Sequence, residues 1–83
     1  MRVAVRYFAS VREALGSGDE VEVPAGATVG AVRDALIAKG AAHAAALGRG
    51  RPVRGALDHV LCDEAAVVAE GAEVGFFPPV TGG

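Results

Sequence analysis

The chain has 83 residues, of which 52% are hydrophobic and 22% charged, and its formal net charge is −2. This composition is typical of one small globular domain and not of a disordered chain. Its basic residues form no dense cluster, which argues against nucleic-acid binding. No apolar run approaches the roughly 18 residues of a membrane span, and no signal peptide is apparent. Because a single cysteine suits a reducing compartment, we expect a cytoplasmic protein that does not bind membranes.

Residues 2–8 alternate between polar and apolar side chains, which predicts a half-buried strand with Val3 and Val5 facing the core. Phe8 then falls on the face that carries arginines. This position has two interpretations, packing at the edge of the sheet or a patch that binds a partner. Ser10 and Glu13 match a capping box, so we expect a short helix with Ser10 as its N-cap and its end at Leu15.

Residues 20–23 alternate again and predict a second strand, antiparallel to the first because the connection is short. Thr28 is a suitable N-cap for the main helix, which should end at Gly40. The helical spacing places one set of side chains inward and the charged set outward: Val29, Val32 and Leu36 against Arg33, Asp34 and Lys39. Residues 41–47 are alanine-rich and predict another helix or a single turn of one, and residues 48–52 predict a solvated loop.

The last third of the chain predicts three strands, over residues 53–57, 60–62 and 73–77, with a turn at Asp58 and His59. The order of elements predicts an α+β fold of the ubiquitin-like β-grasp kind, in which a mixed sheet of four to five strands packs on one main helix. The first and last strands should pair in parallel at the centre of the sheet. We expect a β-grasp domain over residues 1–77, followed by a flexible arm over residues 78–83.

The body of the chain offers no obvious catalytic machinery. Cys62 lies near His59, but neither has the ligand spacing of a metal site, so we expect no metal. No neighbouring base favours a thiolate, so Cys62 is better interpreted as a small buried apolar residue than as a nucleophile. We expect no bound cofactor and no enzymatic activity of the chain on its own.

The C-terminus is the most informative stretch, Phe-Phe-Pro-Pro-Val-Thr-Gly-Gly over residues 76–83. Pro78 and Pro79 stiffen the exit from the last strand, since proline fixes φ and favours extended backbone before it. Val80 and Thr81 continue the arm. Gly82 and Gly83 have no side chain, so the tip fits a slot too narrow for other residues. The pattern favours delivery of the Gly83 carboxylate into another protein's active site over an inert, frayed terminus.

A carboxylate is a poor electrophile, so Gly83 needs activation, which adenylation on a partner enzyme would supply. Attack by sulfur on the adenylate would then give a thiocarboxylate, and attack by an amine would give an amide. A partner would also need an apolar surface near the base of the arm. We expect Phe8, Leu61 and Phe77 to form it, because each lies on the less buried face of its strand.

The stretch Tyr-Phe-Ala-Ser-Val-Arg-Glu over residues 7–13, together with the C-terminal octet, resembles the small sulfur-carrier subunit of molybdopterin synthase. The resemblance implies a β-grasp fold and a Gly83 thiocarboxylate made by an ATP-dependent, E1-like adenylating enzyme and a sulfurtransferase. It implies that the arm enters the large synthase subunit, where the catalytic groups lie, usually in a heterotetramer of two small and two large subunits. There the sulfur passes to cyclic pyranopterin monophosphate. Phe8, Leu61 and Phe77 match the family's docking positions.

Other functions share parts of this pattern. A sulfur carrier for thiamine synthesis or tRNA thiolation would have the same fold and diglycine. A ubiquitin-like modifier would be joined to lysines through Gly83. An interaction module with an inert terminus and, more remotely, an enzyme built on Cys62 are the remaining alternatives.

Overall fold

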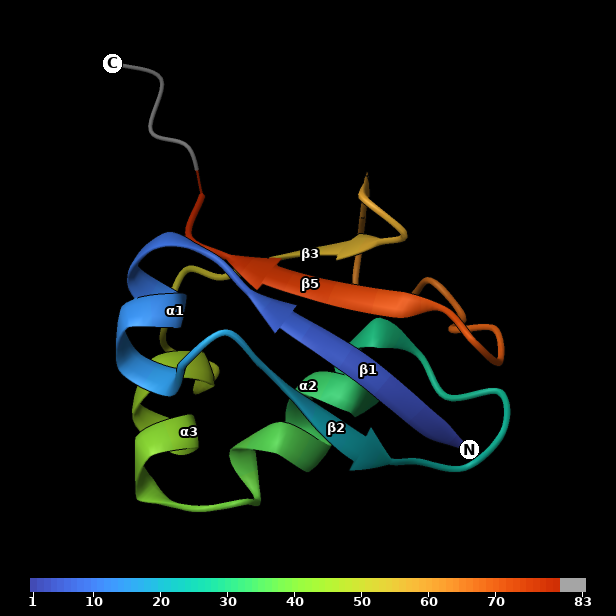
Figure 1. Ribbon diagram of the computed structural model, residues 1–83, viewed down its shortest axis with the longest axis horizontal. Helices are drawn as coiled ribbons and strands as arrows, with labels where there is room; N and C mark the ends of the chain where they lie inside the picture. Colours follow the sequence, from blue (N-terminus) through green and yellow to red (C-terminus); the bar gives the residue numbers. More distant parts are fainter. Residues whose placement is uncertain (80–83) are drawn as a thin grey trace.

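The computed structural model describes residues 1–79, which form five strands and three helices (Figure 1). In chain order the elements are β1 (Arg2–Tyr7), α1 (Ala9–Leu15), β2 (Gly18–Glu22), α2 (Val29–Ile37), α3 (Ala41–Leu47), β3 (Arg54–Leu57), β4 (Val60–Cys62) and β5 (Glu73–Phe77). The predicted α+β class and the predicted helix over residues 41–47 are both confirmed. The second strand begins two residues earlier than its alternation indicated.

The strands form one mixed sheet in the order β2-β1-β5-β3-β4. β1 pairs antiparallel with β2 and parallel with β5, and β5 pairs antiparallel with β3. The predicted parallel pairing of the first and last strands is therefore confirmed. β5 is held on both sides and points toward the end of the sheet where α1 begins (Figure 1). The C-terminal arm leaves from this end.

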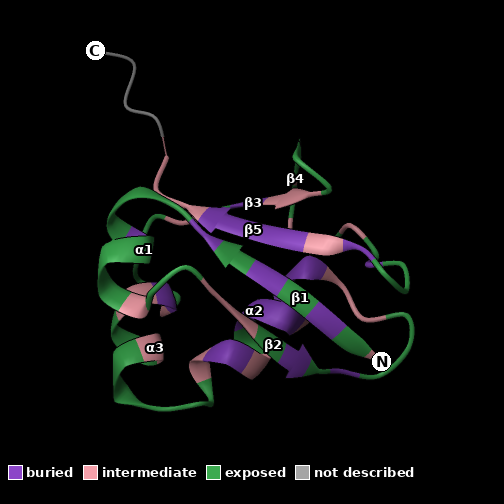
Figure 2. Ribbon diagram, in the orientation of Figure 1, coloured by how far each residue is buried: buried purple, intermediate pink, exposed green. Residues whose placement is uncertain are grey.

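The core lies between one face of the sheet and the helices. Side chains of β1 alternate strictly between exposed and buried, so Val3, Val5 and Tyr7 point into the core (Figure 2). Val74 and Phe76 of β5 join them. Within residues 1–79, no helix covers the opposite face of the sheet, which we call the outer face (Figure 1).

The main helix α2 begins as predicted. The Thr28 hydroxyl oxygen accepts a hydrogen bond from the Ala31 amide at 3.1 Å, which satisfies one of the free donors of the first turn. The helix ends at Ile37, before the predicted stop at Gly40, which instead precedes α3.

The expectation that Arg33 points outward is wrong, because the residue is buried at 4% exposure. Its guanidinium donates hydrogen bonds to the carbonyl oxygens of Leu47, Gly48 and Arg51 at 2.7, 2.8 and 3.1 Å. It also donates to the Glu64 carboxylate at 2.8 Å. Burial of the charge is compensated by these acceptors, which fix the loop over residues 48–52 against α2.

The capping box at Ser10 is also wrong. Helix α1 begins one residue earlier, with Phe8 in the N-cap position and no side-chain cap. The Phe8 carbonyl oxygen accepts from the amides of Val11 and Arg12, so Ser10 lies inside the first turn. The tertiary position of Phe8 causes this shift, because its amide continues the sheet by donating to Phe76 at 3.1 Å. The predicted end is confirmed, with Gly16 at φ 91° after Leu15.

Candidate functional site

The root of the arm is Pro78, directly after the central strand. Phe76 pairs with Tyr7 on one side and with Gly55 on the other, so the last residues of β5 are fixed by two neighbours. Pro78 and Pro79 are half-buried. Val80, Thr81, Gly82 and Gly83 lie outside the described residues, and their predicted roles stay predictions. A fully extended segment of four residues spans at most about 14 Å, which is the greatest length of chain beyond Pro79.

Of the three predicted docking residues, Leu61 lies on β4, Phe77 lies on β5, and Phe8 lies between β1 and α1. Strand register relates the positions of Leu61 and Phe77. Leu61 pairs with Ala56, Ala56 with Gly75, and Gly75 with Arg6, so these residues form one row across the sheet. Phe77 lies two residues beyond Gly75 and therefore on the same outer face. Leu61 is 56% exposed, Phe8 38% exposed and Phe77 half-buried. We call Phe8, Ala56, Leu61, Gly75 and Phe77 the outer patch.

Phe8 belongs to this patch because Gly75 lacks a side chain. A Cβ atom added to Gly75 would lie 3.1 Å from Cε2 of Phe8, so the ring lies directly over the glycine. Gly75 is itself buried. The ring therefore packs against the sheet, in line with the first interpretation of Phe8, and it remains partly exposed; its binding of a partner stays a prediction.

Charged groups border the outer patch. Arg6 lies 4.0 Å from the Glu73 carboxylate, and His59 Nε2 lies 3.7 Å from the same residue. Arg54 pairs directly with Phe77 across the sheet and is exposed. The patch is thus an apolar centre with a polar rim, the arrangement of a protein-binding surface.

Cys62 is half-buried on β4, beside the core. Burial, followed by the negative charge of Asp63, raises the pKa of its thiol, which keeps it protonated at neutral pH. Within residues 1–79, no group of three or more histidine, cysteine or acidic side chains is placed to hold a metal ion. None of the helices described is long and apolar enough to cross a membrane.

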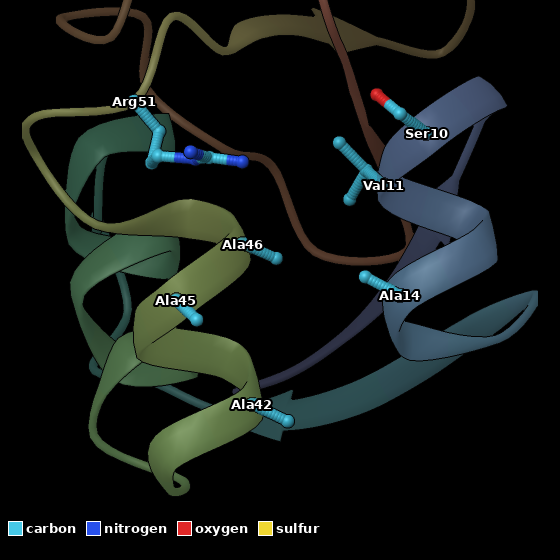
Figure 3. Close-up of a pocket in the computed structure, with 7 residues that line it drawn as sticks. All are labelled: Ser10, Val11, Ala14, Ala42, Ala45, Ala46 and Arg51. Carbon is cyan, nitrogen blue, oxygen red and sulfur yellow. The ribbon is translucent and has the colours of Figure 1, made fainter.

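A groove of about 260 Å³ runs between α1 and α3 (Figure 3). Its walls are small side chains, Ala14 on α1 and Ala42 on α3 among them, and the Arg51 side chain points into its upper end. Ser10 and Arg51 also line an adjoining hollow that includes Pro78. The groove therefore extends to the root of the arm on the helical side of the molecule.

An ion-pair network supports the loop beside this hollow. Arg49 contacts both Asp34 and Glu64, while Arg33 contacts Glu64 from the core side. The hydrogen bond from Arg49 lowers the pKa of Glu64. Burial of the carboxylate opposes this effect in part, and the hydrogen bond from Arg33 adds to it. The network joins α2 to residues 48–64, and it holds the segment that contains Pro52 close to Pro78.

Three residues of the outer patch and its rim were not predicted from the sequence: Ala56, Gly75 and Arg54. A glycine inside a strand often marks a close approach of another group, and Gly75 lies two residues before Phe77, on the same face of the strand. Arg54 gave no such signal, because its significance depends on the register that sets it opposite Phe77.

Comparison with known proteins agrees with this geometry. The family model described as the ThiS family matches residues 5–83, which includes the whole C-terminal arm. The molybdopterin synthase sulfur carrier subunit of Haemophilus influenzae is 40% identical over 80 residues, covering 95% of this chain and 96% of that protein.

Two solved structures share the fold. The small archaeal modifier protein 1 of H. volcanii is 28% identical, with a TM-score of 0.76 over 95% of this chain and 98% of that chain. A complex of subunits 1 and 2 of the molybdopterin-converting factor from Helicobacter pylori contains a chain that is 24% identical, with a TM-score of 0.68 over the full length of both chains. The ubiquitin-like β-grasp fold is confirmed, and the chain belongs to the ThiS family.

Proposed function

We propose that this chain is the sulfur-carrier subunit of molybdopterin synthase, with the Gly83 carboxyl group as its working part. The observation that carries the proposal is a family match that continues through residue 83, at the end of an arm that follows the central strand. The 40% identity to a molybdopterin synthase sulfur carrier subunit supports this pathway over other uses of the fold.

The chemistry requires three proteins besides this chain. An E1-like enzyme would use ATP to form the Gly83 acyl-adenylate, with pyrophosphate as the leaving group. A sulfurtransferase would supply sulfur that attacks the acyl carbon and displaces AMP, which leaves a thiocarboxylate. The large synthase subunit would then accept the arm and catalyse transfer of the sulfur to cyclic pyranopterin monophosphate. This chain contributes the sulfur and its delivery, and it works in the cytoplasm.

The outer patch supplies the docking surface in this proposal. Phe8, Leu61 and Phe77 would bind an apolar surface of the large subunit, which directs the arm from Pro78 into that subunit's active site. The assembly would be a heterotetramer of two small and two large subunits. ATP would bind only to the adenylating enzyme, and this chain would need no cofactor.

Intact mass spectrometry tests the proposal. After incubation with the adenylating enzyme, ATP and a sulfur source, the mass of the chain should rise by the exchange of one oxygen for one sulfur. A chain that lacks Gly83 should fold normally and show no exchange. Unchanged mass of the full-length chain, or equal sulfur transfer to the pterin without Gly83, would contradict the assignment.

A second function is favoured by one specific observation, the likeness to a small archaeal modifier protein. In that case Gly83 would be joined to lysine side chains of other proteins through an amide bond. Blots of cell extracts for this chain separate the two functions. Conjugates of higher mass that disappear on deletion of Gly83 would support the modifier, and their absence together with sulfur exchange would support the carrier alone.

A further inference from the structure

We infer that Arg54 is a charged docking residue, and that the partner which covers the outer patch places a carboxylate opposite it. The inference rests on the proposed function for the identity of the partner. It extends that function by naming the chemistry of the partner surface: an apolar centre for Phe8, Leu61 and Phe77, bordered by an acidic side chain near the root of the arm.

The strand register fixes the position of Arg54. It pairs with Phe77, the last residue of β5, and lies two residues before Ala56 on the same face of β3. It therefore lies on the rim of the outer patch and next to the point where the arm begins. A partner that takes up the arm and covers Phe77 must also cover the Arg54 side chain.

The guanidinium of Arg54 has no acidic partner within ion-pair distance among residues 1–79. Asp63 and Glu64 line the same shallow hollow at the ends of β3 and β4. Neither carboxylate lies within ion-pair distance of Arg54. Asp63 accepts a hydrogen bond from the Ala65 amide at 2.8 Å, and Glu64 binds Arg33 and Arg49. Among the described residues, Arg54 is thus a positive charge without an acidic partner at the edge of an exposed apolar surface.

The other arginines on this face have an acidic neighbour. Arg2 forms an ion pair with Glu22 at 3.2 Å, and Arg6 approaches Glu73 at 4.0 Å. A partner that buried Arg54 opposite an apolar or basic group would lose hydration without compensation. A carboxylate opposite Arg54 avoids this cost and adds electrostatic attraction, which acts mainly on the rate of association.

The test measures association of the full-length chain with the large synthase subunit from the same organism, by surface plasmon resonance at several salt concentrations. Arg54→Glu should lower the association rate constant about tenfold at about 0.05 M salt. The difference from the unmodified chain should shrink strongly near 1 M salt, where charges are screened within about 3 Å.

Arg2→Glu is the matched control. It makes the same change in net charge on the same face, but it lies at the far end of β1, about 13 Å from Arg6 at strand spacing. It should change the rate less than twofold. A partner variant with its interfacial Asp or Glu changed to Lys should recover most of the rate with Arg54→Glu, and thermal unfolding of both variants confirms that they fold.

Equal effects of Arg54→Glu and Arg2→Glu would overturn the inference, because net charge alone would then account for them. So would an Arg54→Glu rate equal to that of the unmodified chain. If the unmodified chain fails to bind the large subunit, the proposed partner and this inference are both contradicted. Binding without any effect of Arg54→Glu contradicts this inference alone.

Discussion

At the scale of single residues, Gly75 determines the shape of the outer patch. A methyl group there would lie 3.1 Å from the Phe8 ring, closer than the roughly 3.5–4.0 Å of a carbon contact. Gly75→Ala should therefore push Phe8 off the sheet and weaken binding of the large subunit about tenfold, with little loss of stability. Calorimetric titration in a Phe8→Ala background should show no further effect, because the same contact is already absent. Equal losses in both backgrounds would show that Gly75 acts without Phe8.

Arg33 is the residue whose removal should cost most stability among the charged positions. Arg33→Met fills similar space but leaves the carbonyls of the loop over residues 48–51 without their donor. We expect the free energy of unfolding in urea to fall by about 3 kcal/mol. Arg49→Met is the control, since Arg49 binds the same Glu64 from an exposed position and should cost less than about 1 kcal/mol. Similar losses for the two would contradict the burial argument.

At the scale of elements, the two helix starts that looked alike in sequence differ in how they are capped. Thr28 caps α2 through its hydroxyl, whereas the start of α1 has no side-chain cap because the Phe8 carbonyl serves its first turn. Thr28→Ala should lower the free energy of unfolding by about 1 kcal/mol. Ser10→Ala should leave it unchanged within a few tenths of that, which thermal and urea unfolding can resolve. If Ser10→Ala lowered the free energy of unfolding as much as Thr28→Ala, Ser10 would be a helix cap after all.

At the scale of the whole molecule, one buried phenol links the sheet to α3. The Tyr7 hydroxyl donates to the Asp19 carboxylate at 2.8 Å, and His43 of α3 contacts the same carboxylate at 2.8 Å. Burial, then the hydrogen bond to Asp19, then its charge, raise the pKa of Tyr7 well above its usual value. The folded chain therefore keeps this proton above pH 10, where the unfolded chain releases it.

The unfolded state then binds fewer protons, so stability falls as pH rises above about 10. Tyr7→Phe lacks this proton. At about pH 8 this variant should be about 1 kcal/mol less stable than the unmodified chain, because it loses one hydrogen bond. At about pH 11 the difference in free energy of unfolding between the two chains should be smaller. Urea unfolding at the two pH values measures this. A gap that stays constant or widens would show that Tyr7 does not titrate as its burial requires.

The features that depend on neighbours in the chain were determined by the sequence alone. Alternation predicted the strands, helical spacing and Thr28 predicted α2, and the octet at the C-terminus, together with residues 7–13, indicated the family. These properties are local because backbone preference and side-chain periodicity act over a few residues. The order of the elements then restricted the topology to a sheet with its first and last strands in parallel.

Tertiary structure decided the features whose causes lie far apart in sequence. Arg33 can be buried because acceptors surround its guanidinium. These acceptors lie 14 to 31 residues later in the chain, so the pattern of charges along the helix does not reveal them. Phe8 became an N-cap and a member of the outer patch because β5 placed Gly75 beneath it. Arg54 gained its position opposite Phe77 only through strand register. Sequence thus determined the elements and the family, while the pairing of distant strands decided the composition of the outer patch.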